Sequence, residues 1–223
     1  MTVMKNSIAI KVLLLTGALV PICFALSYVI FGVLEVPFDQ VAVVYDTLTG
    51  KLLEPFPAGT YILGPFRRVA NRYPLEILEY TMINFEDGAY PPGDAIEART
   101  ADGQPVWVGI TVFVMVDPNN VNTLYTRWGA FYLDRFVRPI SRAIVRDAIA
   151  QYTAHEIVSQ RRVELRNVIR AELSGRFAEE GLMLYDALIR DMDFTPEYAS
   201  LLEAQLIATQ RTMLTQAAAT PAP

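Results

Sequence analysis

The sequence predicts an α+β domain carried by a single N-terminal transmembrane helix. Three observations lead to this fold class. Residues 12–34 contain no charged side chain, β-type runs occupy residues 37–117, and apolar residues recur at helical spacing after Asn120. The chain has 223 residues, 52% of them hydrophobic, which is enough for one such domain with its own core and hardly enough for two.

The uncharged run at residues 12–34 is long enough to anchor the chain in a membrane. It contains 23 residues, and a spanning helix needs about 20. A cleaved signal peptide is the alternative, but its apolar region would measure about 7–15 residues and end at a small-residue cleavage site. The one candidate site, Ala25-Leu26-Ser27, is followed by more apolar residues. We therefore expect an uncleaved signal anchor.

The charges on either side of this run predict a single-pass topology. Lys5 and Lys11 precede it, and Glu35 and Asp39 follow it closely. The positive-inside rule then places the N-terminus in the cytoplasm and the main domain outside it. A bacterial inner membrane with a periplasmic domain fits this arrangement, as does a mitochondrial inner membrane with a domain in the intermembrane space.

The first half of the soluble part is predicted to be mostly β. A strand at 41–45 precedes a turn at 46–50, and the break Pro57-Ala58-Gly59 precedes a second strand at 60–63. A longer strand is expected at 75–85, followed by a polar Pro/Gly-rich loop at 86–94. The turn Ala101-Asp102-Gly103-Gln104 predicts a hairpin that joins a strand at 96–100 to one at 106–116.

The second half is predicted to be mostly helical. A turn at 117–120 starts this region, and Thr153 with Glu156 resembles a capping box that opens a further helix. Gly181 fits a helix stop, 182–194 reads as a return strand, and Pro196 begins a last helix that runs to about residue 216. The apolar faces are expected at Phe136, Ile140, Ala143, Ile144 and Ala148, and at Leu165, Val168, Ile169, Leu173 and Phe177.

Several motifs occur together and in order. They are the opening 36–44 (VPFDQVAVV), the Pro/Gly turn 57–61 (PAGTY), the hairpin 100–106 (TADGQPV), and the helical segments 138–142, 153–157 and 161–165. With them, residues 36–211 resemble the SPFH family, also called band 7, which includes stomatin, prohibitin and flotillin, and the prohibitin-like members are the most similar. The resemblance implies a non-enzymatic membrane protein that forms oligomers.

The predicted organisation follows from these segments. It comprises an N-terminal flank at 1–11, the anchor at 12–35, the SPFH domain at 36–195, a C-terminal helix at 196–218 and a tail at 219–223. Prohibitins usually continue into a long coiled coil. Here Leu202, Leu206 and Met213 are interrupted by Thr209, which argues against a full cage roof closed by coiled coils.

Composition excludes several kinds of chemistry. One Cys rules out a disulfide scaffold and a Cys-rich zinc module, and the single His, His155, has no second His or thiolate nearby. Asp191 and Asp193 lack a neighbouring nucleophile, so we read them as exposed strand charges. We predict no catalytic, cofactor-binding or metal-binding residue and therefore no enzyme. The net charge of -5 argues against a nucleic-acid partner.

The arginines form the most informative pattern. Arg135, Arg138, Arg142 and Arg146 share one helix face, and Arg162, Arg166 and Arg170 share another. Residues 127–176 hold ten basic and five acidic side chains, whereas 75–102 and 179–203 are strongly acidic. Solvated faces, anionic-lipid contacts and head-to-tail self-association each account for the pattern. We take the face of Arg135, Arg138, Arg142 and Arg146 as the candidate assembly face.

The sequence therefore predicts a membrane-anchored scaffold. Its copies would associate side by side and organise or enclose a membrane patch with its resident proteins. An accessory subunit of one membrane complex, such as a protease or an energy-converting enzyme, is the alternative, and a membrane-bound hydrolase fits less well. The expected partners are membrane lipid, further copies or a paralogue, and a membrane protease or other membrane complex.

Overall fold

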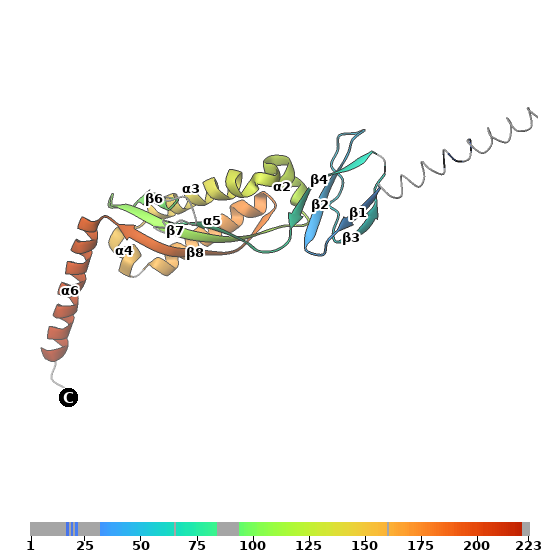
Figure 1. Ribbon diagram of the computed structural model, residues 1–223. Helices are drawn as coiled ribbons and strands as arrows, with labels where there is room; N and C mark the ends of the chain where they lie inside the picture. Colours follow the sequence, from blue (N-terminus) through green and yellow to red (C-terminus); the bar gives the residue numbers. More distant parts are fainter. Residues whose placement is uncertain are drawn as a thin grey trace, which may run out of the picture.

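The computed structural model describes residues 17, 19, 21, 32–64, 66–83, 94–159 and 161–219. These residues form an elongated α+β domain, with two small β-sheets at one end, a larger sheet with helices along the middle, and one long helix leaving the other end (Figure 1). The predicted polar loop at 86–94 falls almost entirely outside the described residues.

The larger sheet is organised around one long strand. Strand β7 (Pro105–Val116) pairs antiparallel with β8 (Leu182–Phe194) along one edge. Its other edge pairs with β5 (Leu78–Met82) near its C-terminal end and with β6 (Ile96–Arg99) near its N-terminal end. The predicted hairpin at 101–104 and the return strand at 182–194 are confirmed. The predicted strand at 75–85 was too long, because β5 covers only its centre.

Alternate residues of β7 face two different environments. Val106, Val108, Ile110, Val112, Val114 and Val116 are all fully buried, and they belong to the main hydrophobic core. Trp107, Phe113 and Met115 point to the opposite face, where they stay partly exposed and outside that core. Helices therefore cover one face of the sheet. The other, which we call the open face, keeps these three side chains partly exposed, although Thr111 in its middle is fully buried.

The helices cover the buried face. They are α2 (Val121–Trp128), the 3₁₀ turn η1 (Gly129–Phe131), the π-helical turn η2 (Leu133–Val137), α3 (Arg138–Ile149), α4 (Ala154–Ser159) and α5 (Arg162–Glu179). Leu165, Ile169, Leu173 and Phe177 of α5 are fully buried, as their spacing predicts. Ala143 is exposed, contrary to expectation, because α3 turns Ser141, Ile144, Val145, Ala148 and Ile149 inward instead.

The capping-box helix is shorter than its sequence suggests. Thr153 and Glu156 open α4, which has only six residues, and a separate helix α5 then begins at Arg162. Gly181 ends this helical region with a φ of 80°. A Cβ atom at that position would lie 2.5 Å from the carbonyl oxygen of Asn120, so glycine is required for conformation and for space.

The two small sheets pair β1 (Val33–Val36) with β3 (Gly59–Ile62) and β2 (Gln40–Asp46) with β4 (Arg67–Pro74). Strand β4 has the sequence RRVANRYP, whose polar residues gave no strand signal, and its pairing with β2 supplies its order. Strand β1 includes residues 33–35, so the domain begins slightly before the end of the predicted anchor.

The last helix, α6 (Pro196–Ala219), projects from the end of the domain opposite the small sheets (Figure 1). Its ring contact between Phe194 and Tyr198, with centroids 5.5 Å apart, joins it to β8. Among the described residues, no helix has both the length and the apolar character needed to cross a bilayer. The predicted anchor lies almost entirely outside those residues.

Candidate functional site

Three of the four arginines of the predicted assembly face form hydrogen bonds or ion pairs within their own chain. Arg138 and Arg142 both form ion pairs with the carboxylate of Asp94, and the Arg142 distance is 3.2 Å. Arg142 also donates to the carbonyl oxygens of Asp94 at 2.9 Å and Ala95 at 3.3 Å. Arg146 donates to the carbonyl of Glu97 at 2.8 Å. We call Asp94, Arg138, Arg142 and Arg146 the arginine clamp.

The arginine clamp ties α3 to β6 and to the residues that lead into it. An edge strand carries unpaired carbonyl groups, and Arg146 donates to one of them, at Glu97, while Arg142 donates to the two carbonyls just before the strand. The Asp94 side chain is only 13% exposed, and its hydrogen bond raises the pKa of Arg138, against the effect of burial. The clamp is therefore a structural feature of one copy, whatever further contacts it makes.

Arg135 differs from the other three arginines. It is exposed, and its guanidinium lies over the ring of Phe131 at 5.2 Å from the centroid. Phe131 is itself 61% exposed. This pair presents a cation and an aromatic ring to the surroundings. An assembly role for the four-arginine face stays a prediction, and Arg135 is its most accessible member.

A second polar cluster joins the β6–β7 hairpin to α4. The hydroxyl of Thr100 donates to Asp102 at 2.5 Å and accepts from the amide of Gln104 at 3.0 Å, which closes the turn. Asp102 in turn accepts a hydrogen bond from the amide of Ala154, the first residue of α4, at 3.1 Å. The TADGQ motif therefore forms a turn and also caps a neighbouring helix.

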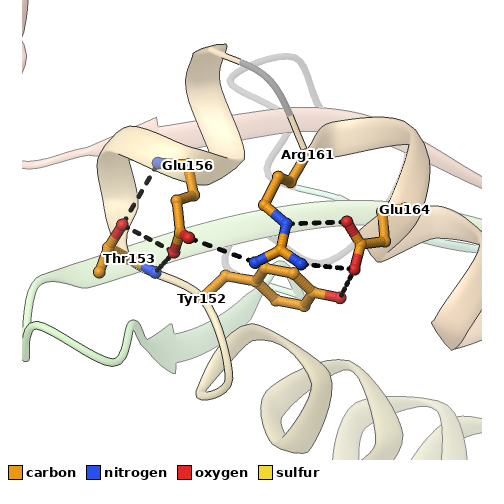
Figure 2. A network of polar contacts seen from close by, with 5 residues as sticks. All are labelled: Tyr152, Thr153, Glu156, Arg161 and Glu164. Atoms are coloured by element: carbon orange, nitrogen blue, oxygen red, sulfur yellow. Dashed lines mark hydrogen bonds and ion pairs between the residues drawn. The ribbon is translucent and has the colours of Figure 1, made fainter.

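The junction between α4 and α5 is built around Arg161 (Figure 2). The Thr153–Glu156 capping box is confirmed, with the Thr153 amide donating to Glu156 at 2.9 Å and the Glu156 amide donating to the Thr153 hydroxyl at 3.3 Å. Arg161 pairs with Glu156 at 3.2 Å and Glu164 at 2.8 Å. Its guanidinium stacks on the ring of Tyr152, 5.0 Å from the centroid.

These contacts lower the pKa values of the carboxylates. Hydrogen bonds from Thr153 lower the pKa of Glu156, and the hydrogen bond from Arg161 lowers the pKa of Glu164. Burial would raise the pKa of Asp102, but donors from Thr100 and Ala154 outweigh it and lower that pKa. The charged groups of this cluster pair with one another within one chain, so we interpret the cluster as a structural link between α4 and α5.

In the described structure, the acidic side chains at the hairpin end of the open face are not paired in this way. Glu97 of β6 pairs across the sheet with Trp107 of β7, and Trp107 pairs with Asp193 of β8. Directly opposed residues place their Cβ atoms about 4.5–5.5 Å apart, so Trp107 has an acidic residue as its neighbour on each adjoining strand. Within the described part of the chain, neither Glu97 nor Asp193 forms an ion pair. We call Glu97, Trp107 and Asp193 the acidic-aromatic row.

Farther along the same face, the polar groups pair with one another. Arg190 donates to the Thr111 hydroxyl at 3.1 Å and lies 3.7 Å from Glu79. Thr81 bonds to Thr111 at 2.9 Å. By contrast, Glu97 and Asp193 of the acidic-aromatic row have no ion-pair partner among the described residues.

The α5 arginines have different surroundings from one another. Arg170 pairs with Asp186 at 3.3 Å, and Arg162 donates to the carbonyl of Arg190 at 3.3 Å. Arg166 forms no hydrogen bond or ion pair within the described residues. It lines a shallow pocket with Arg162, Val163, Leu188 and Ile189, and Val163 is 61% exposed. The N-terminal half of α5 therefore presents a basic and apolar surface.

The other residues singled out from the sequence lie on the surface. His155 is exposed in the first turn of α4, and Asp191 and Asp193 are exposed on β8. In the part of the chain that the structure describes, no three His, Cys, Asp or Glu side chains gather as metal ligands would.

Sequence reasoning missed the partners of the charged groups. Asp94 lies at the end of a loop-like stretch, and nothing in the local pattern predicts that two arginines 44 and 48 residues away converge on it. Trp107 occupies a strand that reads as uniformly apolar. Its alternation with the buried valines was the available signal that it faces away from the core.

Comparisons with known proteins agree on one family. The model of the family described as "SPFH domain / Band 7 family" matches residues 34–222. Prohibitin-1 of Saccharomyces cerevisiae is 26% identical over 196 residues, which is 88% of this chain and 64% of that protein. Prohibitin-2 of the same yeast is 27% identical over 169 residues, 76% of this chain and 50% of that protein.

A third relative is "Mitochondrial prohibitin complex protein 1" of Caenorhabditis elegans. It is 26% identical over 171 residues, which is 77% of this chain and 58% of that protein. The chain thus spans between half and two thirds of the length of these relatives.

Proposed function

The chain belongs to the SPFH domain / Band 7 family, and we propose on that basis that it is a prohibitin-like membrane scaffold. Its copies are anchored by residues 12–34 and associate side by side, either with themselves or with a paralogue. Together they organise or enclose a patch of membrane and its resident proteins. The observation that carries this proposal is the family match over nearly the whole domain, together with the similarity to prohibitins.

The arrangement of the domain supports the proposal. Strand β1 begins at Val33, within the last residues of the predicted anchor, so the small sheets would lie nearest the membrane and α6 at the far end (Figure 1). The surfaces that remain for neighbouring copies are the helical layer and the open face of the sheet. One relative carries the word "complex" in its name, which is consistent with an assembled form.

An accessory subunit of a single membrane complex, such as a membrane protease or an energy-converting enzyme, is the second candidate. The arginine clamp favours it, because three of the four predicted assembly arginines already bond within the chain. With only Arg135 outside the clamp, the four-arginine face suits one small contact with a single complex better than a contact repeated between all copies of a scaffold.

Sizing the full chain in a mild detergent separates the two candidates. A large homo-oligomer supports the scaffold, and a monomer or dimer supports the accessory subunit. Arg135→Glu is the informative variant of the predicted face, since Arg135 is outside the arginine clamp. It should shrink the oligomer without lowering the melting temperature. An unchanged size would remove Arg135 from the assembly surface.

The proposed topology has its own test. The uncleaved anchor and the extracytoplasmic domain predict a mature chain that keeps Lys5 and Lys11, and a domain that protease reaches only from the outer side. Mass spectrometry and protease accessibility in oriented membranes measure both. A mature N-terminus near Ser27, or protection of the domain on the outer side, would contradict the proposal.

A further inference from the structure

The open face of the sheet presents an unpartnered surface that combines aromatic, apolar and acidic groups. Trp107, Phe113 and Met115 of β7 lie on this face, and none of them belongs to the hydrophobic core. The neighbouring strand β8 adds Tyr185, which is 65% exposed, and Met183, which is 38% exposed. Exposed apolar groups that gather on one face and carry charges at its end are typical of protein contact surfaces.

The acidic-aromatic row gives this face its chemical preference. An indole face attracts cations, and guanidinium groups stack on it especially well. Glu97 and Asp193 on either side of Trp107 supply carboxylate oxygens that can accept hydrogen bonds from the same cation. The nearest basic side chain on β6, Arg99, instead donates to the carbonyl of Gly103 at 3.4 Å. The row is therefore suited to an arginine from outside the chain.

The same chain carries a matching surface on its helical layer. Arg166 is exposed at the N-terminal half of α5 and has no ion pair or hydrogen bond among the described residues. Val163 beside it is 61% exposed, and Arg162 adds a second positive charge. This surface is basic and apolar, whereas the acidic-aromatic row is acidic and aromatic. Among the described residues of one copy, Arg166 forms no ion pair with Glu97 or Asp193, so the two surfaces are available to a second copy.

We propose that the open sheet face of one copy binds the α5 surface of a second copy, with Arg166 of the second copy placed against Trp107 between Glu97 and Asp193. The contact is heterologous, since each copy offers one surface and receives the other. Such contacts close into rings or continue as filaments. This inference rests on the proposed self-association and names the surfaces that carry it.

Charge reversal at the two partners tests the contact directly. Asp193→Arg and Arg166→Asp should each shift the detergent-solubilised full chain from the large oligomer to monomer or dimer. The double variant Asp193→Arg/Arg166→Asp should restore the large species, because the charge pair is exchanged and kept. Glu76→Arg is the matched control, since Glu76 is exposed, lies outside β6, β7, β8 and α5, and changes the net charge by the same amount as Asp193→Arg. Mass photometry measures the sizes, and circular dichroism measures folding.

Trp107 provides a second readout that does not depend on reversing a charge. The chain has two tryptophans, and Trp128→Phe leaves Trp107 as the single tryptophan, which can be excited selectively above the tyrosine absorption. At 1 M salt the Debye length falls to about 3 Å, so the charged contact should dissociate. Acrylamide should then quench the Trp107 emission more strongly than it does in the oligomer, where the indole is covered. Trp107→Ala should dissociate the oligomer, whereas Trp107→Phe should keep part of the binding.

The outcomes separate the inference from the proposed function. Restoration by the double variant, with Trp107 shielded in the oligomer, supports the contact. A large wild-type oligomer that Asp193→Arg, Arg166→Asp and Trp107→Ala leave intact overturns the inference and leaves the scaffold proposal standing. A wild-type chain that stays monomeric at every concentration and salt overturns the self-association, and the inference with it.

Discussion

The two faces of strand β7 carry alternate residues of the same stretch of sequence, but they differ in burial and in how their charged neighbours are paired. The covered face buries six valine and isoleucine side chains completely, under helices that bond back to the sheet through the arginine clamp. The open face keeps its aromatic and sulfur-containing side chains partly exposed and leaves Glu97 and Asp193 without a counter-ion among the described residues. One face therefore stabilises the domain through burial, whereas the other keeps exposed side chains that the core does not use.

Truncating one residue on each face tests this division most strongly. Ile110→Ala removes a fully buried side chain and should lower the free energy of unfolding by about 2–5 kcal/mol. Met115→Ala on the open face removes partly exposed surface and should cost less than half as much. Urea unfolding of the full chain in detergent measures both. Equal losses would show that the open face is packed as tightly as the core.

Removing one arm of the arginine clamp should have a moderate effect. Arg142→Met keeps much of the side-chain length but leaves the Asp94 and Ala95 carbonyls without their donor and should cost about 1–3 kcal/mol. Arg135→Met is the matched control, since Arg135 contacts only the Phe131 ring in the described structure and should change stability little. If both variants melt alike, the clamp contributes nothing to the stability of the covered side.

The turn that joins β6 to the central strand β7 should respond more weakly. Gly103 has a φ of 80° with open space where a Cβ would lie, so Gly103→Val introduces backbone strain without a clash. We expect a loss of about 1–2 kcal/mol, seen as a lower melting temperature with unchanged membrane insertion. Gly103→Asn should recover part of it, because Asn adopts this conformation more readily. An unaffected Gly103→Val variant would mean that the turn relaxes freely.

Acidification should weaken the α4–α5 junction while leaving the apolar core unchanged. The folded-state pKa values of Glu156, Glu164 and Asp102 lie below their ordinary values, so their contribution is present above those values and is lost as the pH falls through the lowered ones. Thr153→Ala should lower the melting temperature at neutral pH and converge with the wild type in acid. A difference that persists unchanged in acid would contradict this linkage.

Local patterns in the sequence were sufficient for most elements of the fold. The alternation and turn residues around Gly103 predict the β6–β7 hairpin, and Thr153 with Glu156 predicts the start of α4. These features depend on interactions between residues close in the chain, so a single sequence reveals them. Strand β4 was missed for the opposite reason, since its polar residues are ordered by pairing with β2 and not by their own preference.

The partners of the charged side chains depended on the tertiary structure. The even spacing of Arg138, Arg142 and Arg146 establishes that they share a helix face, but it does not tell what that face meets. Only the packing of α3 beside β6 brings them to Asp94 and to the carbonyl of Glu97 in β6. Likewise Glu97, Trp107 and Asp193 come from three strands, and a cross-strand row exists only once the register is set. Periodicity fixes direction within one element, whereas contacts between elements depend on how distant segments pack.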